Sequence, residues 1–123
     1  MTATQPPAPM TTDDYAGRMT RVVADATAAG LDGLLITPGP DLVWLTGYQP
    51  TAITERLTVI VLTPGQRPTL LVPTLERPDA EGAVGAPALS IVDWADGEDP
   101  FERASALLQE HATMGISDSA WAM

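Results

Sequence analysis

A short stretch bounded by glycine, residues 39–48, constrains the fold of this chain more than any other. It follows a continuous apolar run, residues 33–36, which is typical of a buried strand. Pro40 suits the first turn of a helix, where its missing N–H costs nothing, and Gly47 suits the helix end. The side chains expected to lock this helix over the sheet are those of Leu42, Trp44 and Leu45. The sequence therefore predicts a strand followed by a tight helical corner.

An amphipathic helix is expected before this corner. Thr11 is a favourable N-cap, and Asp14 lies three residues later, at the spacing of a capping box. Gly30 follows as a helix-ending glycine. The apolar positions between them repeat with helical spacing and are Tyr15, Met19, Val22, Val23 and Ala26. Residues 1–11 are rich in Thr, Ala and Pro without periodicity, so we expect a disordered leader followed by one domain over residues 12–123.

Three strands and two helices are expected between the corner and Gly115. Residues 57–62 form a β-branched run, and residues 69–72 follow after a turn at 63–66, which predicts an antiparallel hairpin. A short helix is predicted around residues 80–83, and a further strand over residues 89–94. The sequence then predicts a helix that begins at Asp99 and ends at Gly115, with an inner face of Ala104, Leu107, Leu108, His111 and Ala112.

A last strand is predicted to begin at Ile116, and the final residues resemble the start of a further helix, so we expect a truncated domain. This order of helices and strands predicts an α/β layered fold with a mixed sheet.

The net charge limits the classes of molecule that this chain is expected to bind. Lys and Arg total 6 and Asp and Glu total 16, which gives a formal net charge of −10. Such acidity argues against nucleic-acid and membrane surfaces as partners. The absence of cysteine excludes disulfides and thiolate chemistry, and it agrees with a cytoplasmic location. The first ten residues have no basic region followed by an apolar block, so no signal peptide or membrane anchor is expected there.

Few residues suggest chemistry within the chain itself. His111 is the single histidine, and no cysteine is present to complete a triad or a zinc site. The acidic stretch 93–99 lacks the ligand spacing of a calcium loop. The candidate residues for substrate contact are Tyr48, Glu55 and Arg56, because loops on rigid scaffolds commonly carry such contacts. The structural alternatives remain open, since Glu55 and Arg56 also suit a surface ion pair of little energetic value.

Residues 29–37, with the sequence Ala-Gly-Leu-Asp-Gly-Leu-Leu-Ile-Thr, and residues 41–48, with Asp-Leu-Val-Trp-Leu-Thr-Gly-Tyr, carry a family resemblance. They resemble the N-terminal domain of the creatinase/prolidase/aminopeptidase P family. Asp41 stands where that family usually has Asn, and Trp44 stands where Tyr is usual. The resemblance implies a three-layer domain with a mixed sheet of about five strands flanked by helices.

The resemblance also implies a function for a longer parent protein. It implies a metal-dependent Xaa-Pro peptidase whose two divalent metals, manganese above all, are held in a C-terminal catalytic domain absent from this chain. On this basis we expect no cofactor and no activity here. The expected partners are the protein's own catalytic domain, further copies in a homo-oligomer and a proline-containing peptide. Tyr48, Glu55 and Arg56 would then belong to a loop that restricts substrate access. The alternative is a stand-alone protein-binding module without peptidase activity.

Overall fold

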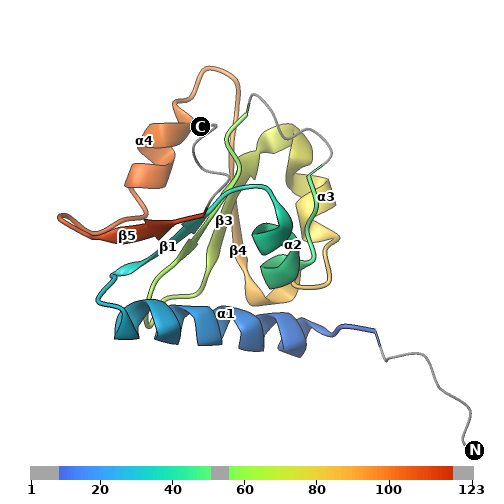
Figure 1. Ribbon diagram of the computed structural model, residues 1–123. Coiled ribbons are helices and arrows are strands. Elements are labelled where there is room, and N and C mark those ends of the chain that lie inside the picture. The colour runs from blue at the N-terminus through green and yellow to red at the C-terminus, as the bar shows by residue number, and fades with distance from the viewer. Residues whose placement is uncertain (1–8, 51–55, 118–123) are drawn as a thin grey trace, which may run out of the picture.

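The computed structural model describes residues 9–50 and 56–117. Within these ranges the chain forms a five-stranded sheet in the order β4-β3-β2-β1-β5, with helices on both faces (Figure 1). The strands are β1 (Gly33–Ile36), β2 (Val59–Leu62), β3 (Thr69–Pro73), β4 (Ser90–Trp94) and β5 (Met114–Ile116). This arrangement confirms the predicted α/β architecture of about five strands flanked by helices.

The sheet is mixed, as the order of elements predicted. Strand β2 pairs antiparallel with both β1 and β3, so the predicted hairpin is confirmed. Strand β1 pairs parallel with β5, and β3 pairs parallel with β4. Val59 lies opposite Leu71, which places the residues just before β2 beside the residues just after β3.

Helix α1 (Thr12–Ala28) begins and ends as the sequence predicted. The Thr11 backbone N–H donates to Asp14 Oδ2 at 2.9 Å, and the Asp14 N–H donates to Thr11 Oγ1 at 3.2 Å, which completes the capping box. Gly30 follows with φ of 85°, in the left-handed region that favours glycine. Of the expected leader, residues 1–8 lie outside the described part of the chain.

Three helices pack on one face of the sheet. They are α1, α2 (Pro40–Thr46) and α3 (Arg77–Glu81), accompanied by the 3-10 turns η1 (Thr74–Glu76) and η2 (Ala86–Ala88). Met19 of α1, Leu42 and Leu45 of α2 and Ala80 of α3 share one core cluster with sheet residues Ile60, Leu62, Leu70 and Val72. The larger core therefore lies on this face. None of the helices in the described ranges is long and apolar enough to cross a membrane.

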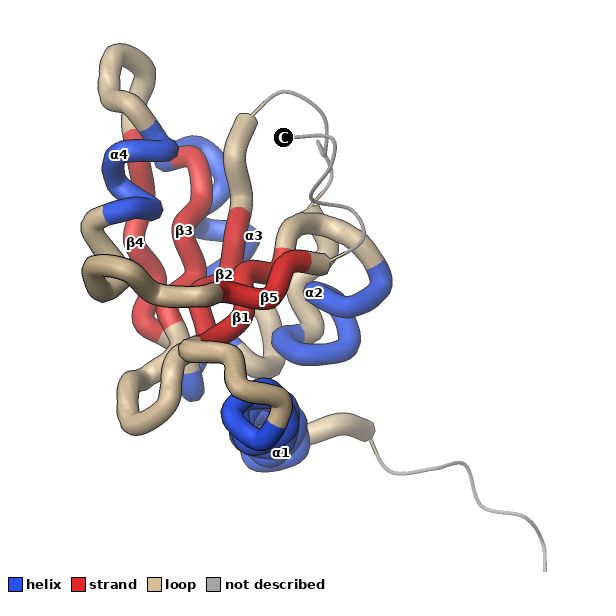
Figure 2. The backbone as a smooth tube through the Cα atoms, turned by 60° about the vertical axis from the view of Figure 1, so that its left-hand side comes forward, coloured by secondary structure: helices blue, strands red, loops and turns tan. Residues whose placement is uncertain are grey.

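In the described part of the chain, one helix, α4 (Pro100–Ser105), lies on the opposite face (Figure 2). Ala104 packs there against a smaller core made by Leu57, Val59, Leu71 and Trp94. Asp99 accepts hydrogen bonds from the N–H groups of Phe101 and Glu102, so the predicted helix start is confirmed.

The predicted extension of this helix to Gly115 is wrong, because the chain leaves the helix after Ser105 and turns back to the sheet. The Asp32 N–H donates to Thr113 O at 2.8 Å, and the Thr113 N–H donates to Asp32 Oδ2 at 2.7 Å. These bonds begin the pairing of β5 with β1. His111, expected in the last helical turn, instead has φ of 60° in the connecting turn. Tertiary pairing thus overrides the helical spacing of the apolar residues.

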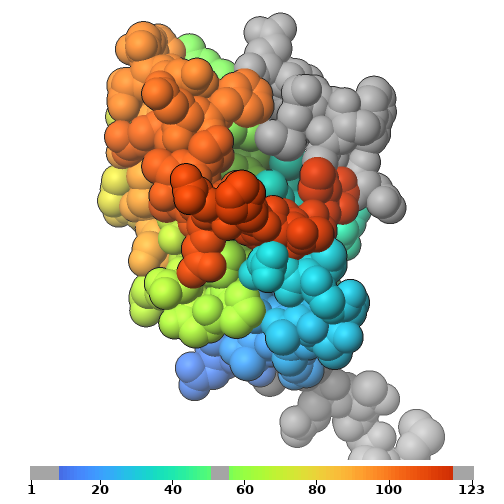
Figure 3. All heavy atoms as spheres, turned by 90° about the vertical axis from the view of Figure 1, so that its left-hand side faces the viewer, coloured from blue at the N-terminus to red at the C-terminus, as the bar shows by residue number. Residues whose placement is uncertain are grey.

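Gly115 lies in β5 and does not end a helix. A Cβ atom at this position would approach Leu34 Cδ2 to 2.7 Å and Leu31 Cδ1 to 2.9 Å. Figure 3 shows the β5 end of the chain across the middle of one face, between α4 above and the β2–β3 turn and α1 below. Ile116 is 64% exposed there. Strand β5 is thus one of the two edge strands of the sheet, with β4 at the other edge.

Candidate functional site

The end of α2 fixes the first candidate residue, Tyr48. Gly47 adopts φ of 76°, and its N–H donates to Val43 O at 2.7 Å, which ends the helix. The buried Thr46 hydroxyl donates to Leu42 O at 2.8 Å, and the Tyr48 N–H donates to Thr46 Oγ1 at 3.0 Å. The predicted helical corner is thus confirmed, and it holds the Tyr48 backbone in one orientation.

Tyr48 is a buried core residue, and its ring does not lie exposed beside the loop that follows. Its exposed fraction is 4%, and it belongs to the larger core cluster. Burial above all, together with the nearby charges of Glu76 and Asp79, raises the pKa of the Tyr48 hydroxyl to about 12. The hydroxyl is therefore neutral at physiological pH, and contact with a substrate stays a prediction for this residue.

Arg56 lies on the other side of the same connection, just before β2. Its Nη2 atom is 3.1 Å from Asp96 Oδ1, and both side chains are largely exposed. Glu55, the predicted neighbour in this pair, lies outside the described residues. Exposed ion pairs of this kind contribute at most about 1 kcal/mol, so Arg56 remains free to exchange partners.

The next residue, Leu57, is held firmly. The Trp94 indole Nε1–H donates to Leu57 O at 2.9 Å, and both side chains are 8% exposed. This bond joins the start of the β2 region to the end of β4. It therefore fixes the backbone at the residue that follows Arg56.

Glu76 completes this group and was missed at the sequence level. It lies in η1, directly after β3, where the antiparallel register brings it beside the residues that precede β2. Burial and the charge of Asp79 raise the pKa of Glu76, while the Thr58 side chain and Arg56 act to lower this pKa. We call Tyr48, Arg56, Thr58, Glu76 and Asp79 the carboxyl cluster. The one sequence signal for Glu76 was a carboxylate that closely follows a strongly apolar strand.

The helix α2 also carries a surface feature that the sequence did not predict. Trp44 was expected to lock α2 over the sheet, but its exposed fraction is 45%, so that interpretation is wrong. The Arg18 guanidinium carbon lies 4.5 Å from the centre of the Trp44 ring, and Arg18 Nη1 donates to Trp44 O at 2.8 Å. Tyr15, Arg18 and Trp44 line a groove of about 960 Å³, together with Pro38, Pro40 and Pro50.

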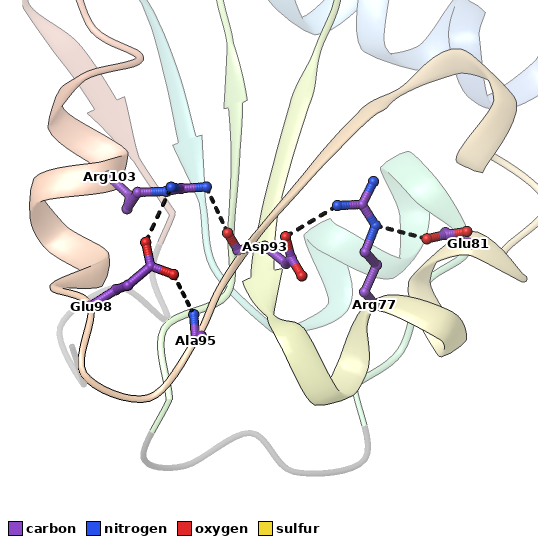
Figure 4. A network of polar contacts seen from close by, with 6 residues as sticks. All are labelled: Arg77, Glu81, Asp93, Ala95, Glu98 and Arg103. Carbon is purple, nitrogen blue, oxygen red and sulfur yellow. Dashed lines mark hydrogen bonds and ion pairs between the residues drawn. The ribbon is translucent and has the colours of Figure 1, made fainter.

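The acidic stretch at the end of β4 forms a structural network (Figure 4). Arg77 Nη1 is 3.2 Å from Asp93 Oδ1, while its Nε donates to Glu81 Oε1 at 2.8 Å. Arg103 Nη2 donates to Asp93 O at 2.8 Å and its Nη1 pairs with Glu98 at 3.2 Å. The Thr74 hydrogen bond, followed by the charge of Arg77, lowers the pKa of Asp93. These contacts tie α3 and α4 to the edge strand β4.

The described residues do not fit a two-metal centre. Across residues 9–50 and 56–117, no group of three or more His, Cys, Asp or Glu side chains converges as metal ligands. The carboxylates of the network in Figure 4 already pair with arginine, and the single histidine stands apart in a turn. The geometry described above offers a scaffold and surfaces, and we derive no catalytic step from it.

The sequence matches the model of the Creatinase/Prolidase N-terminal domain over residues 18–123. The chain belongs to this family. It is 40% identical over 95 residues to the probable dipeptidase PepE of Mycobacterium tuberculosis, a match that covers 76% of this chain and 25% of that relative. The probable dipeptidase PepE of Mycobacterium bovis matches equally. The chain thus spans about a quarter of the length of the curated relatives it matches.

Solved structures agree with this assignment. The crystal structure of dipeptidase PepE from Mycobacterium ulcerans has a TM-score of 0.81 at 36% identity, and covers 91% of this chain and 30% of that one. Recombinant prolidase from Thermococcus sibiricus gives 0.76 at 28% identity, with the same two coverages. An isolated Creatinase/Prolidase N-terminal domain of an X-Pro dipeptidase from Streptococcus pyogenes shares the fold at 20% identity, with a TM-score of 0.71 over 85% of this chain and 78% of that one. The relatives of this creatinase-type domain are dipeptidases and prolidases, which are hydrolases.

Proposed function

We propose that this chain is the non-catalytic N-terminal domain of a metal-dependent Xaa-Pro peptidase, either a dipeptidase or an aminopeptidase, in the cytoplasm. The observation that supports this proposal most directly is the PepE match, which spans 76% of this chain and 25% of the relative. In this proposal a C-terminal domain holds the two divalent metals, with manganese expected, and acts on a proline-containing peptide. The N-terminal domain, in this proposal, supplies oligomer contacts and limits the access of substrate to the active site.

A chimera tests whether the catalytic residues lie outside this chain. The segment of Mycobacterium tuberculosis PepE that matches this chain is exchanged for the matching part of this chain, and hydrolysis of Ala-Pro and Gly-Pro is measured with added manganese. We expect the chimera to hydrolyse the dipeptides and this chain alone to be inactive. Activity of the isolated chain, or a folded chimera without activity, would contradict the proposal.

The segment between Tyr48 and Arg56 is the proposed access loop. Its two ends are anchored, since Tyr48 is buried and Leu57 O accepts the Trp94 hydrogen bond. Loops held on a rigid scaffold commonly carry binding contacts, which supports this proposal. Arg56 precedes the anchored Leu57 and carries an exposed charge. It is therefore the residue best suited to contact a peptide substrate.

Replacement of Arg56 in the chimera tests the access loop. We expect Arg56→Ala to change the ratio of kcat/KM for a tripeptide over a dipeptide, with a stability loss below about 1 kcal/mol. Arg103→Ala is the matched control, because Arg103 also forms an exposed ion pair, with Glu98 at 3.2 Å. An unchanged ratio in Arg56→Ala, or an equal change in Arg103→Ala, would remove Arg56 from the proposed loop.

The Trp44 groove is the proposed oligomer contact of this domain. Exposed tryptophan and arginine are enriched at the centres of protein interfaces, and here the two side chains stack on each other. We expect Trp44→Ala to lower the fraction of dimer measured by analytical ultracentrifugation. Leu75→Ala, at a side chain 80% exposed and outside the groove lining, is the control and should leave the dimer intact. An unchanged dimer in Trp44→Ala excludes the groove as the contact.

A further inference from the structure

The chain that precedes α1 begins beside the Trp44 groove. Met10 is half-buried, and its Sδ atom accepts a hydrogen bond from Arg18 Nη2 at 3.5 Å. Arg18 also stacks on Trp44, and both side chains line the groove. Helix α1 packs against α2, and its N-terminal end lies on the α2 side of the molecule (Figure 1). The residues before Met10 are therefore joined to the fold at the groove itself.

The groove has the chemistry of a site for an extended proline-rich peptide. Tyr15 and Trp44 line it together with Pro38, Pro40 and Gln49. Aromatic-lined grooves of this kind bind polyproline II helices, whose backbone carbonyls have no hydrogen-bond partners within the helix. In residues 9–50 and 56–117, the Trp44 indole N–H and the Tyr15 hydroxyl donate to no acceptor. Two lining residues therefore offer donors that such carbonyls require.

The chain itself contains a peptide of this composition. Residues 4–9 read Thr-Gln-Pro-Pro-Ala-Pro and carry no charge, and we call them the proline segment. Pro6 and Pro9 are three residues apart, which is one turn of a polyproline II helix, so that conformation would place both rings on one side. Because proline restricts φ before binding, the segment loses little conformational freedom when it binds. Its neutrality also suits the groove, because Arg18, the charged residue of the described lining, already donates to two acceptors within the chain.

We propose that the proline segment occupies the Trp44 groove of its own chain in a polyproline II conformation and thereby competes with a second copy for this surface. Six residues in this conformation span about 19 Å. The groove volume of about 960 Å³ is at the upper end of the volumes found for ligand sites. A tether of one residue, Met10, keeps the segment at an effective concentration of about millimolar, so a weak contact suffices. The competition rests on the oligomer contact proposed above, whereas occupancy of the groove does not.

Paramagnetic NMR of the full chain tests this occupancy. The sequence contains no cysteine, so Thr4→Cys provides a single attachment site for a nitroxide label. At a concentration at which the chain sediments as a monomer, we expect the Trp44 indole and Gln49 amide signals to lose most of their intensity. The Gln66 amide is the internal reference and should keep its intensity. It lines a second pocket with Thr27, roughly 18 Å along α1 from the groove.

A proline variant distinguishes a bound segment from one that is only tethered nearby. Pro6→Gly combined with Pro7→Gly keeps the length of the tether but removes the restricted φ angles. In the labelled chain, this double variant should recover most of the lost Gln49 intensity. Thr2→Ala is the matched control, because Thr2 lies outside the proline segment, and the loss should persist there.

Two variants test the groove side of the contact. Trp44→Ala removes an aromatic surface and a donor, so the Gln49 amide of the labelled chain should recover its intensity. Leu75→Ala is the matched control, because Leu75 is 80% exposed and lies outside the groove lining, and the loss should persist. Dispersed amide spectra of both variants establish that each is folded.

Three results would overturn occupancy of the groove. The first is an equal loss at Gln49 in the double proline variant, and the second is a loss that Trp44→Ala leaves unchanged. The third is a loss that also appears when labelled chains without ¹⁵N are mixed with unlabelled ¹⁵N chains, since the segment would then bind a second copy.

The competition has its own readout. Deletion of residues 1–8 should raise the fraction of dimer in analytical ultracentrifugation, because the groove is then open to a second copy. An unchanged or lower fraction would overturn the competition. A dimer that is insensitive to Trp44→Ala, in a chain whose Gln49 signal still responds to the label, would reject the proposed oligomer contact and support occupancy by the proline segment.

Discussion

Replacement of Trp94 by phenylalanine tests whether the indole N–H of this residue fixes the start of the β2 region. The change removes the bond from Nε1 to Leu57 O, which is 2.9 Å long and lies between two side chains that are each 8% exposed. A buried carbonyl left without its donor costs about 1–3 kcal/mol. The smaller ring also loses two buried carbon atoms, at roughly 0.8 kcal/mol each. We therefore expect Trp94→Phe to lower the free energy of unfolding by about 2.5–4.5 kcal/mol.

The loss is measurable by thermal and urea unfolding followed by far-ultraviolet circular dichroism. For a chain of 123 residues, about 4 °C of Tm corresponds to 1 kcal/mol, which predicts a decrease of about 10–18 °C. Trp44→Phe is the matched control, because Trp44 is 45% exposed and its stacking with Arg18 contributes about 0.5–1 kcal/mol. Equal losses in the two variants, or a loss below about 1 kcal/mol in Trp94→Phe, would refute this account of the Leu57 anchor.

Three more predictions concern the elements around the candidate site. Gly85→Ala should destabilise the fold by about 1–3 kcal/mol in a urea titration, because the new Cβ would overlap Thr46 O, the acceptor of the Gly85 N–H bond; an unchanged midpoint would contradict this close packing. Burial raises the pKa of Tyr48 to about 12, so its contribution to stability should be full below pH 10 and be lost as pH rises toward 12; Tyr48→Phe should remove this loss in alkaline melts, and its persistence would assign it to another group. Thr11→Ala should cost about 1 kcal/mol by breaking the capping box with Asp14, whereas Thr20→Ala, on the exposed face of α1, should cost less in the same denaturation assay.

The sequence predicted the elements whose signals are local. The capping box at Thr11, the proline that begins α2 and the glycine that ends it each act within a single turn, and the structure confirms them. The β-branched run before the turn at residues 63–66 likewise became β2 of the hairpin. Local signals therefore sufficed for the corner that supports Tyr48.

Other features were predicted wrongly or missed, and all but the orientation of Trp44 depend on contacts between distant residues. Leu42 and Leu45 share the inner face of α2, so Trp44 between them points outward, which helical spacing alone implied. The end of α4 and the place of Gly115 depend on the pairing of β5 with β1, which no local pattern encodes. Glu76 acquires its importance only because β3 returns beside β2.

The β1–β5 pairing has a consequence for how the chain acquires its fold during synthesis. The hydrogen bond from Thr37 N to Ser117 Oγ joins residues 80 positions apart, and the Thr113–Asp32 bond joins residues 81 positions apart. At about 5–20 residues per second, a ribosome needs roughly 4–16 s to make the chain between them. Once β2 has been made and has paired, β1 has β2 on one side and an open edge on the other until β5 emerges. The nascent chain therefore exposes a pairing edge beside its largest core until β5 emerges, and this interval is when we expect chaperone contact and aberrant strand pairing to be most frequent.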